Sequence, residues 1–408
     1  MARTDRIGLK RVTLALATSA VAAIGVVPGV AWAQAQTLDE ALAAAYTNNP
    51  SLLSERADLR ATDEGVPQAL ANWRPDVSIS GDISRERTYL TSRTPERTKT
   101  RTPRGSSLDV TQPLFRGFRT LAATRSAEAD VQAARASLVA TEQTVLLNAV
   151  TAYVDVVADQ AVLDLRKNNE QVLTRQLEAT RDRFRVGEIT RTDVSQAEAR
   201  LAGATADRIQ AEGTLAASRA TFLNVIGERP GNLERPPDTA VGDLPISLEA
   251  AKQIAETDHP DIVAARYSEL SAQETVRSVA GELLPTVSLS GSAERRFEVS
   301  ADNNRQDDLS IGLSLSVPLY QQGAVFSRLR AAKQDVGKSR LDFETTRRNV
   351  IESLTSAWET LKSARAQIGS IKSQIQANEV ALEGVQREAQ VRKLFRHTPV
   401  PGTTMPEP

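Results

Sequence analysis

Residues able to carry out acid-base, nucleophilic or metal chemistry are scarce in this sequence of 408 residues. Cysteine is absent, which excludes disulfides, thiolate metal sites and lipid attachment at a cysteine. Histidine, the commonest general base, occurs twice: His259 lies in a helix-capping His-Pro pair and His397 lies near the C-terminal end. Neither stands beside a serine or carboxylate in a way that suggests a catalytic triad, and glycine-rich phosphate loops are absent. We therefore expect a protein that is not an enzyme, with no catalytic residue, cofactor or metal.

One acidic cluster has the oxygen ligands that calcium prefers, namely Asp302-Asn303-Asn304 followed by Asp307-Asp308. The cluster lacks the glycine and the terminal glutamate that characterise a calcium-binding loop. The favoured interpretation is a solvated hairpin tip rather than a metal site.

A tight turn between two helices is predicted around residue 187. Gly187 tolerates a positive φ angle and can therefore end a helix. Either Thr190 or Thr192 can cap the following helix, and Asp193 then lies in its first turn, where the helix dipole favours negative charge. The candidate site residues of this turn are Gly187, Thr190, Arg191, Thr192 and Asp193.

Turning to the elements that must position these residues, the N-terminal segment 1–33 is predicted to be an export signal. Four basic residues precede an uncharged run from Val12 to Val30, and Ala31-Trp32-Ala33 has the small-x-small pattern of a cleavage site. A membrane anchor is the alternative, but the cleavage pattern favours removal. After this segment we expect no stretch of roughly twenty apolar residues, so that only β-strands could cross a membrane. The net charge of −1 argues against binding to nucleic acid.

The rest of the chain contains one pattern twice. Residues 37–41 return at 247–251 with a shift of 210 positions, and residues 108–115 return at 313–320 with a shift of 205 positions. Landmarks in a fixed order indicate a duplicated unit of helix, β-hairpin and long α-helical hairpin. The first repeat is predicted at 34–230, with a helix at 37–70, a β-hairpin at 75–115 and a long helical hairpin at 118–226. A linker follows at 231–246. The second repeat is predicted at 247–391, with a helix at 247–280, a β-hairpin at 285–318 and a long helix at 324–391, and residues 392–408 form a tail outside the pattern.

The strands and the long helices differ in periodicity. Val77, Ile79, Leu313 and Leu315 alternate with serines, which indicates strands whose two faces meet different media. An ordinary half-buried sheet is the alternative. In the long helices, apolar residues recur seven positions apart, which indicates coiled-coil seams that pack against partner helices.

This arrangement resembles the TolC family of outer-membrane efflux and secretion channels. The most specific matching segment is 183–194, which contains the predicted turn. The Asn49-Pro50 and His259-Pro260 helix starts and the Pro-Leu-aromatic strand exits at 113–115 and 318–320 also match. The resemblance extends from residue 37 to residue 391.

The resemblance implies an α+β membrane protein that is one protomer of a trimeric, twelve-stranded β-barrel joined to a long periplasmic α-helical barrel. Physical reasoning agrees, because four strands have two open edges and cannot cross a bilayer alone. The implied function is a passive trimeric exit duct of the cell outer membrane, extending into the periplasm, for a tripartite efflux pump or a type I secretion system. The implied partners are two further copies in a homotrimer, a periplasmic adaptor (membrane fusion) protein, an inner-membrane transporter and outer-membrane lipid, without nucleic acid.

The resemblance also gives roles to the candidate residues. It places the turn at Gly187 at the tapered end of the tunnel near the adaptor, and it matches Asp193 to an aspartate that helps to close the aperture. The alternative for Asp193 is a purely structural acid at a helix N-terminus. The residues expected to face lipid, with the intervening serines facing the lumen, are Val77, Ile79, Leu313 and Leu315.

The two predicted hairpin tips differ in charge. Five basic residues lie from Arg93 to Arg104, whereas residues 298–308 contain four acidic residues, Glu298, Asp302, Asp307 and Asp308, and one basic residue, Arg305. We hypothesise that both tips are cell-surface loops and that the basic side chains contact lipid phosphates. A charged loop without a ligand is the alternative.

Two other functions are compatible with parts of the pattern. A soluble periplasmic coiled-coil adaptor would explain the long helices and the export signal, but it does not need two amphipathic β-hairpins. The second of these functions is a non-functional truncated duct. The repeat ends at Val391, the counterpart of Val186, and the first repeat continues there with a turn and a return helix. In the second repeat the basic, proline-containing segment 392–408 follows instead. We expect a C-terminally truncated protein from a frameshifted or prematurely ended reading frame, with poor trimer yield and little export.

Overall fold

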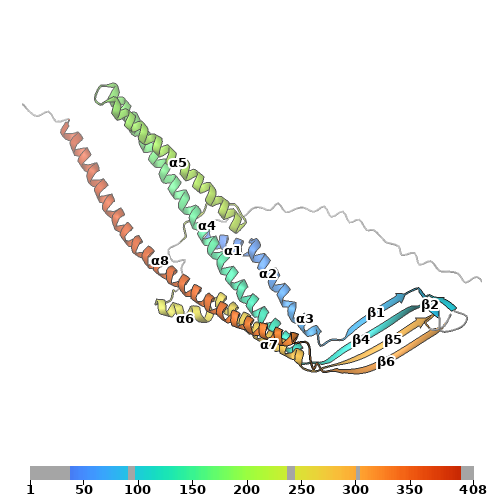
Figure 1. The fold of residues 1–408 in the computed structure, drawn as a ribbon. Coiled ribbons are helices and arrows are strands. Elements are labelled where there is room, and N and C mark those ends of the chain that lie inside the picture. The colour runs from blue at the N-terminus through green and yellow to red at the C-terminus, as the bar shows by residue number, and fades with distance from the viewer. Residues whose placement is uncertain (1–36, 91–96, 237–243, 300–303, 397–408) are drawn as a thin grey trace, which may run out of the picture.

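The computed structural model describes residues 37–90, 97–236, 244–299 and 304–396. The predicted export signal and the end of the predicted tail, 397–408 with His397, lie outside the described residues. The described part is elongated, with a β-sheet at one end and a shaft of long helices running away from it (Figure 1).

The prediction of a single helix at 37–70 is wrong, because a proline divides the segment. A residue that precedes proline disfavours the helical region, and Asn49, before Pro50, is extended. The Asn49 side chain then accepts a hydrogen bond from the backbone N–H of Ser51 at 2.9 Å and so caps the next helix. The segment consists of α1 (Leu38–Asn48), α2 (Pro50–Asp63) and α3 (Gly65–Ala71).

The same break corrects the predicted helix at 247–280. His259 precedes Pro260, is extended, and accepts the backbone N–H of Asp261 through Nδ1 at 3.3 Å. The interpretation of His259 as a helix-capping residue is therefore confirmed. The two helices are α6 (Leu248–Asp258) and α7 (Pro260–Ala280).

The main sheet has four antiparallel strands in the order β1-β4-β5-β6. Each predicted hairpin supplies two neighbouring strands, and the pairing of β4 with β5 joins the two repeats. The first hairpin, predicted at 75–115, contains two further strands, which form a separate two-stranded ribbon at its outer end (Figure 1). The strands are β1 (Asp76–Ile83), β2 (Glu86–Leu90), β3 (Arg97–Arg101), β4 (Arg104–Arg116), β5 (Thr286–Phe297) and β6 (Arg305–Ser316).

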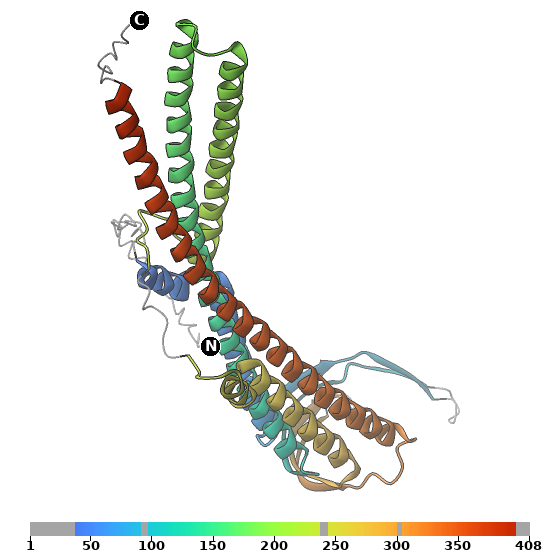
Figure 2. The same ribbon diagram turned by 90° about the vertical axis from the view of Figure 1, so that its left-hand side faces the viewer.

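Three long helices form the shaft, namely α4 (Arg119–Arg185), α5 (Arg191–Ile226) and α8 (Ala324–Arg396). α4 and α5 are antiparallel, and the turn between them lies at the end of the molecule opposite the sheet (Figures 1 and 2). The 67 residues of α4 correspond to a length on the order of 100 Å. α8 continues past its predicted end at residue 391, because no proline occurs before Pro399.

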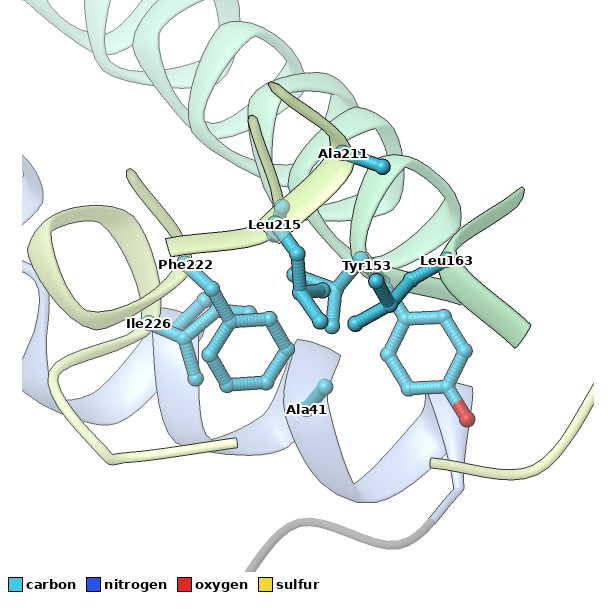
Figure 3. Packing of buried hydrophobic residues seen from close by; sticks show 10 residues of the cluster. Ala41, Tyr153, Leu163, Ala211, Leu215, Phe222 and Ile226 are labelled. Atoms are coloured by element: carbon cyan, nitrogen blue, oxygen red, sulfur yellow. The ribbon is translucent and has the colours of Figure 1, made fainter. Parts of the chain in front are cut away.

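The main hydrophobic core lies where α1 packs against α4 and α5. Tyr153 and Phe222 are fully buried there, with ring centroids 6.4 Å apart. The small side chain of Ala41 lets α1 approach both rings (Figure 3). The Tyr153 hydroxyl donates to the carbonyl oxygen of Glu234 at 2.7 Å, and burial raises the pKa of this hydroxyl. This core holds α5 against α4 and therefore supports the hairpin that carries the distal turn.

α4 is also long and apolar enough, by length and composition alone, to cross a membrane. The expectation that no such stretch follows the export signal is therefore wrong. Ala149, Tyr153 and Val156 of α4 belong to the core just described, although only 28% of its most apolar stretch is buried within the single chain.

Candidate functional site at the sheet and the distal turn

The two faces of the main sheet differ in chemistry. On the half of the sheet nearer the shaft, cross-strand neighbours on one face are apolar, because Val110 lies opposite Val77 and Val287 lies opposite Leu315. This pairing confirms the alternation that was expected from the sequence. Toward the outer end the same face becomes polar, with Ser106 opposite Arg295. The predicted lipid-facing residues are 62–83% exposed in the single chain and are Val77, Ile79, Leu313 and Leu315.

Serine side chains cover the opposite face. Their hydroxyls form hydrogen bonds across neighbouring strands in three places, and a carboxylate joins one of these pairs. Hydroxyls both donate and accept, so this face can hydrate readily and suits contact with water. The pairs are Ser80 with Ser107 at 2.8 Å, Ser288 with Ser314 at 2.7 Å and Ser292 with Ser310 at 2.8 Å, and Ser107 also donates to Asp109 at 2.7 Å.

β1 and β6 form the two edges of the main sheet. Every residue in these two strands is exposed, whereas β4 and β5 are partly covered. An edge strand presents a row of backbone N–H and C=O groups that have no strand partner. The sheet of a single chain is thus incomplete at both edges.

The two hairpins contact each other at the outer end of the sheet. Arg101 Nη1 donates to the carbonyl oxygen of Val299 at 2.7 Å, and the Thr102 N–H donates to Glu298 Oε2 at 3.4 Å. The basic side of one hairpin therefore meets the acidic side of the other. The very tips, residues 91–96 and 300–303 with Arg93 and Asp302, lie outside the described residues.

Among the residues that the structure describes, no group of three or more His, Asp or Glu side chains could hold a metal ion. Asp307, from the cluster that resembles calcium ligands, is paired instead with Arg295 at 2.8 Å and with Arg305. Two guanidinium groups compete with any cation for this carboxylate. Asp302 and Asn303 of the same cluster lie outside the described residues, so the interpretation as a solvated hairpin tip stays a prediction.

A close backbone crossing joins the sheet to the shaft. Gly117, at the end of β4, has φ +61°, and a Cβ atom there would overlap the carbonyl oxygen of Gly281. A Cβ atom on Gly281 would likewise overlap the carbonyl oxygen of Gly117. Both positions require glycine for steric reasons. The sequence contained no signal for this contact between two glycines that lie far apart in the chain.

The predicted distal turn is present between α4 and α5. Gly187 has φ +80°, as expected for the residue that ends a helix. The Arg183 guanidinium donates to both carboxylate oxygens of Glu188, at 3.1 and 2.9 Å, and so ties the last turn of α4 to the loop. This ion pair was not predicted. The two paired residues are five positions apart, and this spacing alone does not predict a contact.

Thr190, and not Thr192, caps α5. The Thr190 N–H donates to Asp193 Oδ2 at 2.9 Å, while the Asp193 N–H donates to Thr190 Oγ1 at 3.4 Å. The backbone hydrogen bond from Thr190, followed by that from its hydroxyl, lowers the pKa of the Asp193 carboxyl. Asp193 therefore presents a negative charge at the exposed end of the shaft. All five candidate residues of the turn, Arg191 included, lie together and are exposed.

Comparison with known proteins identifies the family to which the chain belongs. Residues 39–228 and 252–391 match the family described as outer membrane efflux protein. The chain belongs to this family. Family membership confirms the resemblance inferred from the repeats and excludes a soluble periplasmic adaptor.

Individual relatives agree with the family assignment. The chain is 35% identical over 360 residues to the outer membrane efflux protein BepC of Brucella suis, covering 88% of this chain and 77% of that protein. It is 25% identical over 367 residues to the outer membrane protein TolC of Escherichia coli, covering 86% and 73%. The structure of the outer membrane protein VceC from Vibrio cholerae has the same fold, with a TM-score of 0.70 at 19% identity, covering 86% of this chain and 85% of that one.

This outer membrane efflux protein is a channel for efflux or secretion that extends from the outer membrane into the periplasm. It is a transport protein and not an enzyme. The predicted fold, with long helical hairpins joined to membrane strands, is confirmed. Membership of the family also implies a trimer that works with pump components.

Proposed function

We propose that three copies of this chain form a passive exit duct in the outer membrane. The C-terminal truncation expected from the sequence, with its poor trimer yield and little export, stays a prediction, and the trimer yield measured below tests it. The observation that supports this proposal is the four-stranded sheet with one apolar face, one serine face and two open edges. Unpaired backbone groups cannot remain in a bilayer, so the edges must pair with further copies. Three such sheets supply twelve strands, which lies within the size range of closed outer-membrane barrels. Val77, Ile79, Leu313 and Leu315 then face outer-membrane lipid, and the serines line the lumen.

The helical shaft continues this duct into the periplasm. Residues 362–388 of α8 are exposed in the single chain, and this part of the helix diverges from the α4–α5 hairpin (Figure 2). An uncovered apolar row on a long helix favours packing against helices of the assembly. The row is 51–59% exposed and consists of Ile368, Ile371, Ile375 and Leu382.

The turn at Gly187 is the periplasmic end of the proposed duct. We assign to it the contact with a periplasmic adaptor (membrane fusion) protein, which connects the duct to an inner-membrane transporter. Thr190, Arg191 and Thr192 are exposed there and offer polar groups to such a partner. A serine-lined lumen discriminates little between cargoes, so the transporter selects the drug or protein that is exported.

The orientation can be tested with single cysteines, because the chain has none of its own. Thr98 lies in the outer ribbon and Arg191 begins α5, and both are exposed. A membrane-impermeant maleimide should label Thr98→Cys on intact cells. It should label Arg191→Cys only after the outer membrane has been permeabilised. The reverse pattern, or labelling of both variants on intact cells, would contradict the proposed orientation.

Asp193 is proposed to help keep the aperture closed through its charge, in addition to capping α5. Asp193→Asn retains an oxygen that can accept the Thr190 N–H but removes the charge, whereas Asp193→Ala removes both. If the charge closes the aperture, both variants should raise single-channel conductance in planar bilayers. If Asp193 only caps the helix, Asp193→Asn should conduct like the unmodified protein. That second result would contradict the proposed gating role of Asp193 but would not contradict the proposal that the chain forms a duct.

A further inference from the structure

The outer end of the main sheet sorts its charged side chains by face. On the face proposed to meet lipid, the two outermost cross-strand rows contain three arginines and one aspartate, which are Arg104, Arg295, Arg305 and Asp307. On the opposite face, the neighbouring rows contain three acidic residues and one arginine, which are Asp82, Glu294, Asp308 and Arg296. Positive charge is therefore in excess on one side of the sheet and negative charge on the other.

Contacts within the sheet hold the arginines of the first face in place. Arg295 Nε donates to Asp307 Oδ1 at 2.8 Å, and Arg305 Nε donates to the same oxygen at 3.1 Å. Arg104 lies over the Phe297 ring, with its Cζ atom 5.4 Å from the ring centroid. Arg295 and Arg305 nevertheless remain about half exposed. A guanidinium group has five N–H donors, so both retain donors for a further anion.

These contacts divide the arginines into two positive points. Arg295 and Arg305 converge on Asp307, which offsets one of their two charges, while Arg104 is drawn toward Phe297. Arg104 and Arg305 belong to β4 and β6, on either side of β5, so their backbones lie about 10 Å apart at about 4.8 Å per strand. This separation is wider than one phosphate group. The two points therefore suit two anionic groups rather than one.

A depression of about 410 Å³ adjoins the arginines on this face. Ala293 forms its floor, because this small residue lies opposite Leu108 on one side and Leu309 on the other. Arg295 and Asp307 bound the depression toward the outer end of the sheet. Its apolar part is thus followed directly by a guanidinium group, an order that matches an acyl chain and its anionic headgroup.

We propose that a basic patch, consisting of Arg104, Arg295 and Arg305 with the adjoining depression, binds a glycolipid of the outer leaflet whose headgroup carries two phosphates. The acyl chain lies over Ala293, one phosphate contacts Arg295 and Arg305, and the other contacts Arg104. Guanidinium groups suit phosphate oxygens because their paired N–H donors form charge-assisted hydrogen bonds with them. The inference rests on the proposed duct, whose orientation places this end of the sheet at the cell surface.

The basic patch differs from the basic surface that the sequence suggested. Of the five basic residues from Arg93 to Arg104, which were expected to contact lipid phosphates, only Arg104 belongs to it. Arg295 and Arg305 come from the second hairpin, whose tip the sequence marked as acidic. Most acidic side chains that would repel a phosphate project from the opposite face. The register of the strands, and not the composition of either tip, creates the patch.

Arginine variants that differ in the face of the sheet test this site. Arg295→Gln/Arg305→Gln removes one positive point but keeps polar side chains. Arg296→Gln is the matched control, because Arg296 is adjacent to Arg295 in β5 but projects from the opposite face, where it pairs with Glu294. Native mass spectrometry of the full-length protein in detergent measures binding of lipid A, a glycolipid with two phosphates. The comparison lipids are monophosphoryl lipid A, with one phosphate, and cardiolipin, with two phosphates but no sugar.

The unmodified protein should bind lipid A more tightly than either comparison lipid. Loss of the charge-assisted hydrogen bonds in Arg295→Gln/Arg305→Gln should weaken lipid A binding about tenfold or more, whereas Arg296→Gln should leave it unchanged. Equal effects of the two changes, or no effect of either, would overturn the site. Equal affinity for monophosphoryl lipid A would contradict the contact with a second phosphate, and preference for cardiolipin would contradict the assignment to a glycolipid.

Ala293→Leu tests the depression separately from the charges. The larger side chain fills the floor of the depression but is apolar, so the variant should still assemble. Exclusion of about two methylene groups of an acyl chain should lower the affinity for lipid A about tenfold. Val77→Leu is the control, since it enlarges an apolar side chain on the same face but outside the depression. Equal binding by these two variants would show that no acyl chain lies over Ala293.

Failure of the basic patch and failure of the proposed duct give different results. Every residue of the patch belongs to one chain, so lipid binding can be measured whatever number of chains assemble. Absence of trimers in the unmodified protein would contradict the duct. Lipid A binding that Arg295→Gln/Arg305→Gln does not weaken would overturn the patch alone.

Discussion

Leu313→Arg is expected to remove most of the assembled protein from the outer membrane, whereas Ser314→Arg should have little effect. The two residues are neighbours in β6, are both exposed, and differ only in the face from which they project. An arginine on the lipid face of a barrel costs about 2 to 4 kcal/mol near the middle of the bilayer, and a lumen substitution costs little. A trimer carries the change three times, so its yield responds steeply.

The yield of heat-modifiable trimer in outer-membrane fractions measures this difference. Ile79→Arg and Ser78→Arg provide a second matched pair at the opposite edge of the sheet and should behave in the same way. Equal losses within both pairs would show that the two faces do not meet lipid and water.

Phe222→Ala is expected to cause the largest loss of stability in the shaft. Phe222 is fully buried between α1 and α4, beside Tyr153, and truncation of a buried phenylalanine costs about 3–5 kcal/mol. For a chain of this size, such a loss lowers the midpoint of thermal unfolding by about 5 °C. Because this core fixes α5 against α4, the distal turn should also become more accessible to protease.

Phe184→Ala is the matched control for this prediction. Phe184 lies near the far end of α4 and is 45% exposed, so its truncation removes much less buried surface. Circular dichroism during heating of the detergent-solubilised protein measures both variants. A midpoint that falls equally in both would show that the cluster around Phe222 does not hold the shaft together.

The features that the sequence predicted correctly depend on local rules. Alternation of Leu313 and Leu315 with serines predicts which side chains share a face, because the period of a strand is two. Gly187 predicts a turn because it tolerates a positive φ angle. The repeat itself was visible in the order of such landmarks. The breaks at Asn49 and His259 were also marked locally, by the prolines that follow, but each segment was long enough to suggest one helix.

The features that were missed depend on contacts between distant segments or lack a periodic signal. Gly117 meets Gly281 only because the fold brings two strand ends together, and no local pattern records that meeting. The ribbon of β2 and β3 is polar except for Tyr89 and Leu90, which are adjacent in the sequence, so it has no alternating hydrophobic pattern to detect. Asp193 was expected to gate or to cap, and the structure shows the capping geometry while the gating role stays a prediction.

The central claim is that three chains close one barrel around a serine-lined lumen. Electron cryomicroscopy of the protein purified into lipid nanodiscs tests it most directly. We expect three chains, one closed sheet of twelve strands, Leu313 in contact with lipid and Ser314 at the lumen. A sheet that stays open at β1 and β6, or one that closes with a different number of chains, would contradict the claim.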